Sequence, residues 1–148
     1  MSAVTLCTIG FTKKSAERFF TLLCEAGVKR VLDARLHNVS QLAGFAKKED
    51  LRYFLRQIGN IDYLHLPELA PTQEILDEFK KNRGDWAVYQ KQFLALMKER
   101  RVEQIIAKEI MDGGCLLCSE QSPEHCHRRL IAEYFQDKWG NVEINHLM

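Results

Sequence analysis

Short apolar runs alternate with longer segments of helical spacing along this chain. Val4 to Ile9 is a β-branched run closed by Gly10, which predicts a buried strand. Ser15 then caps a segment whose apolar residues recur at helical spacing until Gly27, and this pattern predicts a helix. The next apolar run predicts a second strand from Lys29 to Asp33.

The middle of the chain carries the clearest helical pattern. The segment from Lys48 to Ile58 has apolar residues at i, i+3, i+4 and i+7, namely Leu51, Phe54, Leu55 and Ile58. Gly59 and Asn60 interrupt this pattern. The following alternation from Ile61 to Leu66 predicts a third strand that stops at Pro67.

The second half repeats this succession of helix and strand. Helical spacing is found in three consecutive segments: Glu74 to Lys81, Trp86 to Arg101, and Val102 to Met111. Gly113 and Gly114 then open a strand from Cys115 to Cys118. The chain closes with a helix from about Pro123 to Trp139 and a strand from Val142 to about Asn145.

Strands that alternate with helices favour a parallel sheet, because a parallel connection needs a crossover that is usually helical. The prediction is therefore an α/β protein with a three-layer, Rossmann-like fold and a mostly parallel sheet of about five strands. A length of 148 residues suits a single domain over residues 1–148.

Composition and charge limit the binding partners and the cellular compartment that we expect for this protein. The formal net charge of +1 gives no general attraction to nucleic acid or anionic lipid. Neither a secretory signal pattern nor an apolar run of membrane-spanning length occurs, so we expect a cytoplasmic protein without a membrane partner. Its five cysteines are odd in number and irregularly spaced, which favours reduced thiols. Cys7, Cys24 and Cys115 lie in apolar stretches and are expected in the core.

Ionisable residues gather where the predicted strands end. Asp33 and Arg35 follow the second strand, His65 lies at the end of the third, and Cys118 and Glu120 follow the fourth. In open parallel sheets, ligands bind beyond the carboxyl ends of the strands. These side chains are therefore expected to face one crevice.

The segment LLCSEQSPEHCHRRLIAEYF, at residues 116–135, holds the densest set of reactive side chains. Ser122 is a plausible N-cap with Pro123 at the first helical position, which places Cys126 in the first helical turns. A thiol near a helix N-terminus, beside His127 and Arg128, can have a lowered pKa and hold more of its nucleophilic thiolate form.

Several known catalytic and binding motifs require residues at a fixed spacing that this sequence does not have. No arginine stands six positions after Cys118 or Cys126, as a phosphatase loop requires, and no CxxC motif occurs. The spacing of Cys118, Cys126 and the histidines matches no familiar zinc pattern, so no metal site is predicted, and nucleotide cofactors are not implied because neither GxxxxGK[ST] nor GxGxxG is present. Whether Cys118 and Cys126 form a redox pair stays open.

Four segments together resemble the domain-of-unknown-function family 488. They are TIGFT at the start, LDARLHNVSQLAGF after the second strand, YLHLPEL at the third and LLCSEQSPEHCHRRLIA near the end. The resemblance implies an α/β fold and a polar cluster that maps onto Asp33, Arg35, His65, Glu120, Cys126, His127 and Arg128.

The leading hypothesis is a small enzyme that acts on a polar or anionic small molecule, or on a nucleotide-like group. Its expected catalytic residues are Cys126, His127, Glu120 and His65. Its expected substrate-binding residues are Asp33, Arg35, Arg128 and Cys118. Two alternatives stay open: a non-catalytic module that binds nucleic acid or a protein partner, and a metal-binding protein. The oligomeric state is not predicted.

Overall fold

A computed structural model describes residues 3–37, 44–81, 85–118 and 126–148. Its five strands form one sheet in the order β3-β2-β4-β1-β5, and every neighbouring pair is parallel. The strands are β1 (Val4–Gly10), β2 (Arg30–Asp33), β3 (Asp62–His65), β4 (Gly114–Cys118) and β5 (Val142–His146). The predicted parallel α/β fold is confirmed.

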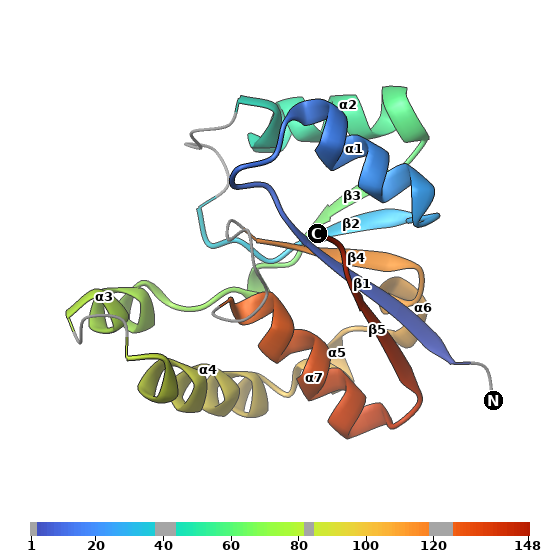
Figure 1. The fold of residues 1–148 in the computed structure, drawn as a ribbon. Helices are drawn as coiled ribbons and strands as arrows, with labels where there is room; N and C mark the ends of the chain where they lie inside the picture. Colours follow the sequence, from blue (N-terminus) through green and yellow to red (C-terminus); the bar gives the residue numbers. More distant parts are fainter. Residues whose placement is uncertain (1–2, 38–43, 82–84, 119–125) are drawn as a thin grey trace.

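Helices cover both faces of this sheet (Figure 1). One face carries α1 (Ala16–Glu25) and α2 (Lys48–Gly59). The other face carries the remaining helices: α3 (Gln73–Lys81), α4 (Trp86–Arg100), α5 (Val102–Ile105), α6 (Lys108–Met111) and α7 (His127–Trp139). Two short 3₁₀ helices, η1 (Gly44–Ala46) and η2 (Pro67–Leu69), complete the described elements.

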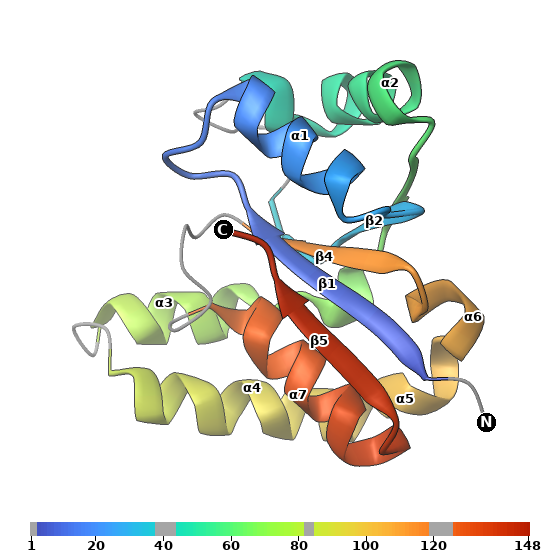
Figure 2. The same cartoon turned by 45° about the vertical axis from the view of Figure 1, so that its right-hand side comes forward.

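Successive side chains of the central strands point to opposite faces of the sheet, and this alternation produces two hydrophobic cores. In β1, Leu6 packs into the core beneath α4 and α7, whereas its neighbour Cys7 packs beneath α1 and α2. Leu116 and Cys115 divide in the same way in β4. Both faces are therefore buried, and in Figure 2 β5 lies beside β1 at the edge of the sheet.

Three sequence predictions need correction. The segment from Val102 to Met111 forms two short helices, because buried Ile106 adopts an extended backbone between them. Cys24 is exposed because successive residues of a helix are rotated by about 100°, which turns Cys24 away from the face that Leu23 buries. In α2, Ile58 of the predicted apolar face is 53 % exposed. Among the described residues, no helix has the length and apolar character that a bilayer crossing requires.

Gly114 in β4 has no free space for a side chain. A Cβ atom built there would stand 2.6 Å from Leu32 Cδ1 and 3.0 Å from the backbone oxygen of Met111. We expect Gly114→Ala to lower the free energy of unfolding by about 1–3 kcal/mol, because a well-packed core resists an added methyl group. Urea unfolding measures this change, and an unaltered midpoint would show that the strand moves aside without cost.

Candidate functional site

The candidate site lies where the chain leaves two neighbouring central strands toward opposite faces of the sheet. β1 leads to α1 on one face, whereas the adjacent β4 leads to α7 on the other (Figures 1 and 2). The chain therefore separates at the carboxyl ends of β1 and β4, which is where ligands bind in doubly wound sheets.

A buried ion pair lies at the end of β2. Arg35 donates from Nε to Asp33 Oδ1 and from Nη2 to Asp33 Oδ2, both at 2.8 Å, and the two side chains are 2 % and 0 % exposed. The hydroxyl of Tyr63 also donates to Asp33 Oδ2. Burial alone would raise the pKa of Asp33, but the hydrogen bonds and charge of Arg35, together with Tyr63, hold it below its ordinary value. The guanidinium predicted to bind substrate therefore binds Asp33 through two of its three nitrogens, Nε and Nη2.

Arg128 connects β1 to β4 from the first turn of α7. Its side chain is fully buried, Nε donates to Thr8 Oγ1 at 3.2 Å, and Nη1 donates to Cys118 Sγ at 3.5 Å. Thr8 Oγ1 also lies 2.6 Å from His146 Nδ1. Because the hydroxyl oxygen accepts from Arg128, its own proton is available to His146. The charge of Arg128 thus acts on the thiol at the strand end.

Cys118 and Cys126 are joined as a disulfide, and both residues are buried. Cys126 is the N-cap of α7 with an extended backbone, φ −135° and ψ 140°, so the helix begins at His127 rather than near Pro123. Ser122 and Pro123 lie outside the described residues. The Cα atoms of the two cysteines are 7.4 Å apart. Disulfides usually span about 4.4–6.8 Å between Cα atoms, so this backbone also has room for two separate thiols.

Two histidines donate to backbone carbonyls at the end of β2. His127 Nε2 donates to the Ala34 oxygen at 2.8 Å, and His65 Nε2 donates to the Arg35 oxygen at 3.0 Å. Burial lowers the pKa of His127 to about 4, although the hydrogen bond to Ala34 opposes this shift. Neutral His127 with its proton on Nε2 keeps the lone pair of Nδ1, and so it can accept a proton or bind a metal.

Ligand atoms of Cys118, Cys126 and His127 all lie within 4.8 Å of one another. Two thiolates and an imidazole are a donor set that suits zinc. The sulfurs can serve as such ligands only in the dithiol state, since the thiolate is the ligand form. The sequence offered Cys118, Cys126 and His127 as possible ligands, but their spacing matches no familiar zinc pattern, so their grouping became visible only in the fold.

The structure thus brings most of the predicted site residues to one end of the sheet. These are Asp33, Arg35, His65, Cys118, Cys126, His127 and Arg128. Glu120 lies outside the described residues. Sequence reasoning missed Tyr63, and it also missed Lys14, whose Nζ is buried after the end of β1. The consecutive residues Lys13 and Lys14 stand beside a strand end, but nothing in their order shows which of them turns inward.

Two large grooves lie outside this cluster, although the second shares Tyr63 with it. One, of about 710 Å³, runs between α1 and α2 over Phe20 and Phe54. The other, of about 680 Å³, follows β3 and includes Arg52 and Tyr63. Neither groove is lined by a cysteine of the disulfide, so volume alone would misplace the candidate site.

Comparison with known proteins gives one match. No curated protein and no solved structure matches the chain. A family model, described as "Domain of unknown function DUF488", matches residues 15–135. The TIGFT segment precedes this span, whereas the other three segments that carry the resemblance lie within it. Because the match covers most of the chain, the protein belongs to the DUF488 family.

Proposed function

We propose that this protein is a thiol-dependent redox enzyme that acts on a polar, anionic small molecule in the cytoplasm. The observation that carries the proposal is the direct contact of the Cys118 and Cys126 sulfurs next to the buried guanidinium of Arg128. A pair of cysteines that can be joined or separate stores two electrons, and an adjacent cation favours the reactive thiolate.

Cys118 is the better candidate for the attacking thiolate. The sequence favoured Cys126, because His127 and Arg128 follow it directly. In the structure, the guanidinium of Arg128 hydrogen-bonds Cys118 instead, while Cys126 lies at the N-terminus of α7. A full charge at hydrogen-bond distance stabilises a thiolate more than the partial charge of a helix end does. We therefore assign Cys126 the second, resolving role.

The corresponding reaction is the reduction of a small disulfide. The Cys118 thiolate attacks one substrate sulfur, a new S–S bond forms, and the first substrate thiolate leaves and takes up a proton. The thiolate of Cys126 then attacks Cys118 Sγ and releases the second substrate thiol. The protein disulfide that results is reduced to the dithiol by two molecules of a small cellular thiol, which leave as their own disulfide.

A redox titration with the two thiols trapped at each potential tests this function. We expect one two-electron transition that is absent from Cys118→Ser and Cys126→Ser but unchanged in Cys24→Ser, which alters an exposed thiol. In reduced protein, Arg128→Met is expected to slow the alkylation of Cys118 at neutral pH, because it removes the adjacent positive charge that favours the thiolate. A dithiol that never oxidises as a pair would refute the proposal.

The same residues support a second candidate function. In the dithiol state, Cys118, Cys126 and His127 offer three ligands for a zinc ion. Elemental analysis of protein purified with reductant decides between the two functions. About one equivalent of zinc that is released when the cysteines are oxidised would favour metal binding over substrate reduction.

A further inference from the structure

Two buried cationic nitrogens stand out among the described residues. Lys14 Nζ and Arg35 Nη1 are both shielded from solvent, and neither has a hydrogen-bond partner in the described part of the chain. The Arg35 side chain is only 2 % exposed. A buried charged donor without an acceptor is costly, so such a group calls for a partner that the described residues do not supply.

Both nitrogens belong to the same end of the sheet as the cysteine pair. The Lys14 amide donates to the Phe11 oxygen at 3.2 Å, and Arg35 Cζ lies 5.5 Å from the centre of the Phe11 ring. The charge of Arg128 acts on Lys14, and Arg128 itself contacts Cys118. Phe11 thus contacts both the backbone of Lys14 and the guanidinium of Arg35, and Arg128 is near enough to Lys14 and to Cys118 for its charge to act on both.

Among the described residues of this cluster, positive charge exceeds negative charge. Burial lowers the pKa of Lys14, and the charges of Arg128 and Arg18 lower it further. The carboxylate of Asp33 is already engaged by Arg35 and Tyr63. An anion bound beside these cations would reduce their mutual repulsion. It would also accept hydrogen bonds from Lys14 Nζ and Arg35 Nη1.

We infer that Lys14 and Arg35 form an oxyanion subsite that holds a carboxylate or phosphate group of the molecule whose reacting atom lies at Cys118. This inference rests on the proposed thiol function for the identity of the reacting atom. It adds a recognition element to that function: the substrate carries an oxyanion, and Lys14 Nζ and Arg35 Nη1 receive it.

Two alkylating reagents of nearly the same size test the subsite in reduced protein. Iodoacetate carries a carboxylate and iodoacetamide does not, while both react with a thiolate by forming an S–C bond and releasing iodide. The readout is the ratio of the two rates at Cys118, located by peptide mapping. We expect Lys14→Met to lower this ratio about tenfold, since a charge-assisted hydrogen bond to the carboxylate is lost.

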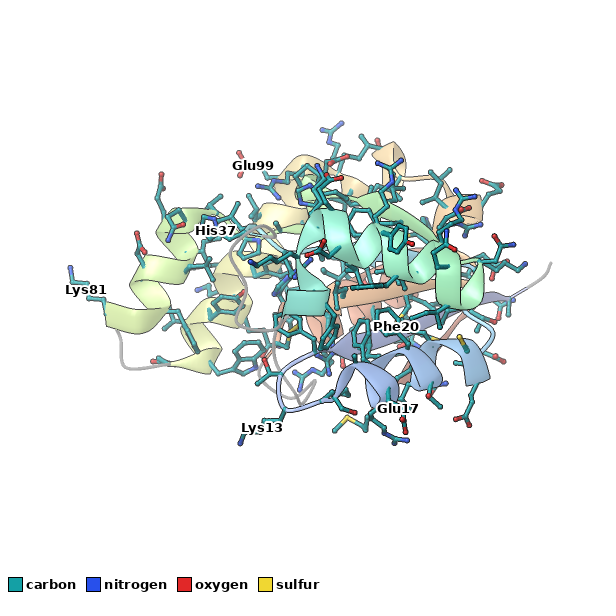
Figure 3. The ribbon with its side chains drawn as sticks, turned by 90° about the horizontal axis from the view of Figure 1, so that it is seen from above. Lys13, Glu17, Phe20, His37, Lys81 and Glu99 are labelled. Carbon is teal, nitrogen blue, oxygen red and sulfur yellow. A yellow bond between two sulfur atoms is a disulfide. The ribbon has the colours of Figure 1, made fainter. Side chains whose placement is uncertain are left out.

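Lys13→Met is the matched control, because it removes the same charge from the preceding residue. Lys13 is exposed and points away from the body of the protein in Figure 3. We expect it to leave the ratio within about twofold of the wild-type value, as rim charges act weakly. An unchanged ratio in Lys14→Met, or an equal fall in both variants, would overturn the subsite.

Titration with inorganic phosphate, followed by NMR, separates this inference from the thiol function. We expect Lys14→Met to weaken phosphate binding about tenfold and Lys13→Met to leave it unchanged. If neither reagent labels Cys118, the thiol function fails and the phosphate titration alone decides the subsite. Phosphate affinity that does not depend on Lys14 would overturn the inference even where Cys118 proves reactive.

Discussion

Replacement of Asp33 by asparagine is expected to lower the free energy of unfolding by about 3–5 kcal/mol, since it leaves the Arg35 guanidinium buried without its counter-charge. Arg35 donates three hydrogen bonds to this carboxylate, one of them from its backbone amide, and both side chains are excluded from solvent. Equilibrium urea unfolding at neutral pH measures the loss.

Asp62→Asn provides the matched control for this variant. Asp62 also pairs with an arginine, Arg56, but at 3.7 Å and with the two side chains 69 % and 64 % exposed. Exposed ion pairs contribute about 0–1 kcal/mol, so Asp62→Asn is expected to change stability by less than 1 kcal/mol. An equal decrease in the free energy of unfolding in the two variants would show that the buried ion pair stabilises the protein no more than the exposed one.

The Asp33 carboxylate also sets an acid limit on stability. Its pKa is lower in the folded protein than in the unfolded chain. Its contribution is therefore present above the unfolded pKa of about 4 and disappears as the pH falls through the lower, folded value.

Acidification from pH 6.5 to 4 is expected to destabilise the protein through His127, by about 3 kcal/mol. The pKa of His127 is about 4 in the folded state, against the ordinary value of 6.5. Between these values the unfolded chain binds a proton that the folded protein does not bind, so stability falls as the pH decreases. The contribution of neutral His127 is complete above pH 6.5. Unfolding free energies measured across this range test the expectation.

His127→Gln should remove most of that pH dependence, because its amide can still donate to the Ala34 oxygen but does not titrate. His37→Gln changes an exposed imidazole and serves as the control. Burial also lowers the pKa of His146, so a smaller slope of the same sign should persist in His127→Gln. A slope that is identical in wild type and His127→Gln would contradict the assignment.

The alternation of apolar runs was sufficient to predict the parallel sheet. A strand such as β4, buried at every position, needs apolar residues throughout, and Cys115 to Cys118 supplies them. The clustering of Asp33, Arg35, Cys118 and Arg128 also followed, because parallel strands end at one edge of their sheet.

Local pattern could not decide where helices end or which face of a helix is covered. Ile106 breaks the predicted helix because its side chain is buried in the core beneath α7, and that demand comes from the whole fold. Cys24 and Ile58 are apolar but stay exposed, because Leu23 and Leu55 of the same helices already occupy the core. Burial is a property of the packed molecule, and sequence periodicity only approximates it.

The chemistry of the site was decided by contacts across long stretches of chain. The sequence placed Arg128 two residues from Cys126, but the inward rotation of α7 directs its guanidinium to Cys118 and Thr8. The sequence predicted Arg35 as a substrate ligand, and the structure adds that its Nε and Nη2 are held by the buried carboxylate of Asp33, so that only Nη1 is left for another acceptor. Residue types and their places at the strand ends therefore indicated where the candidate site lies, and only tertiary packing determined which charge faces which sulfur.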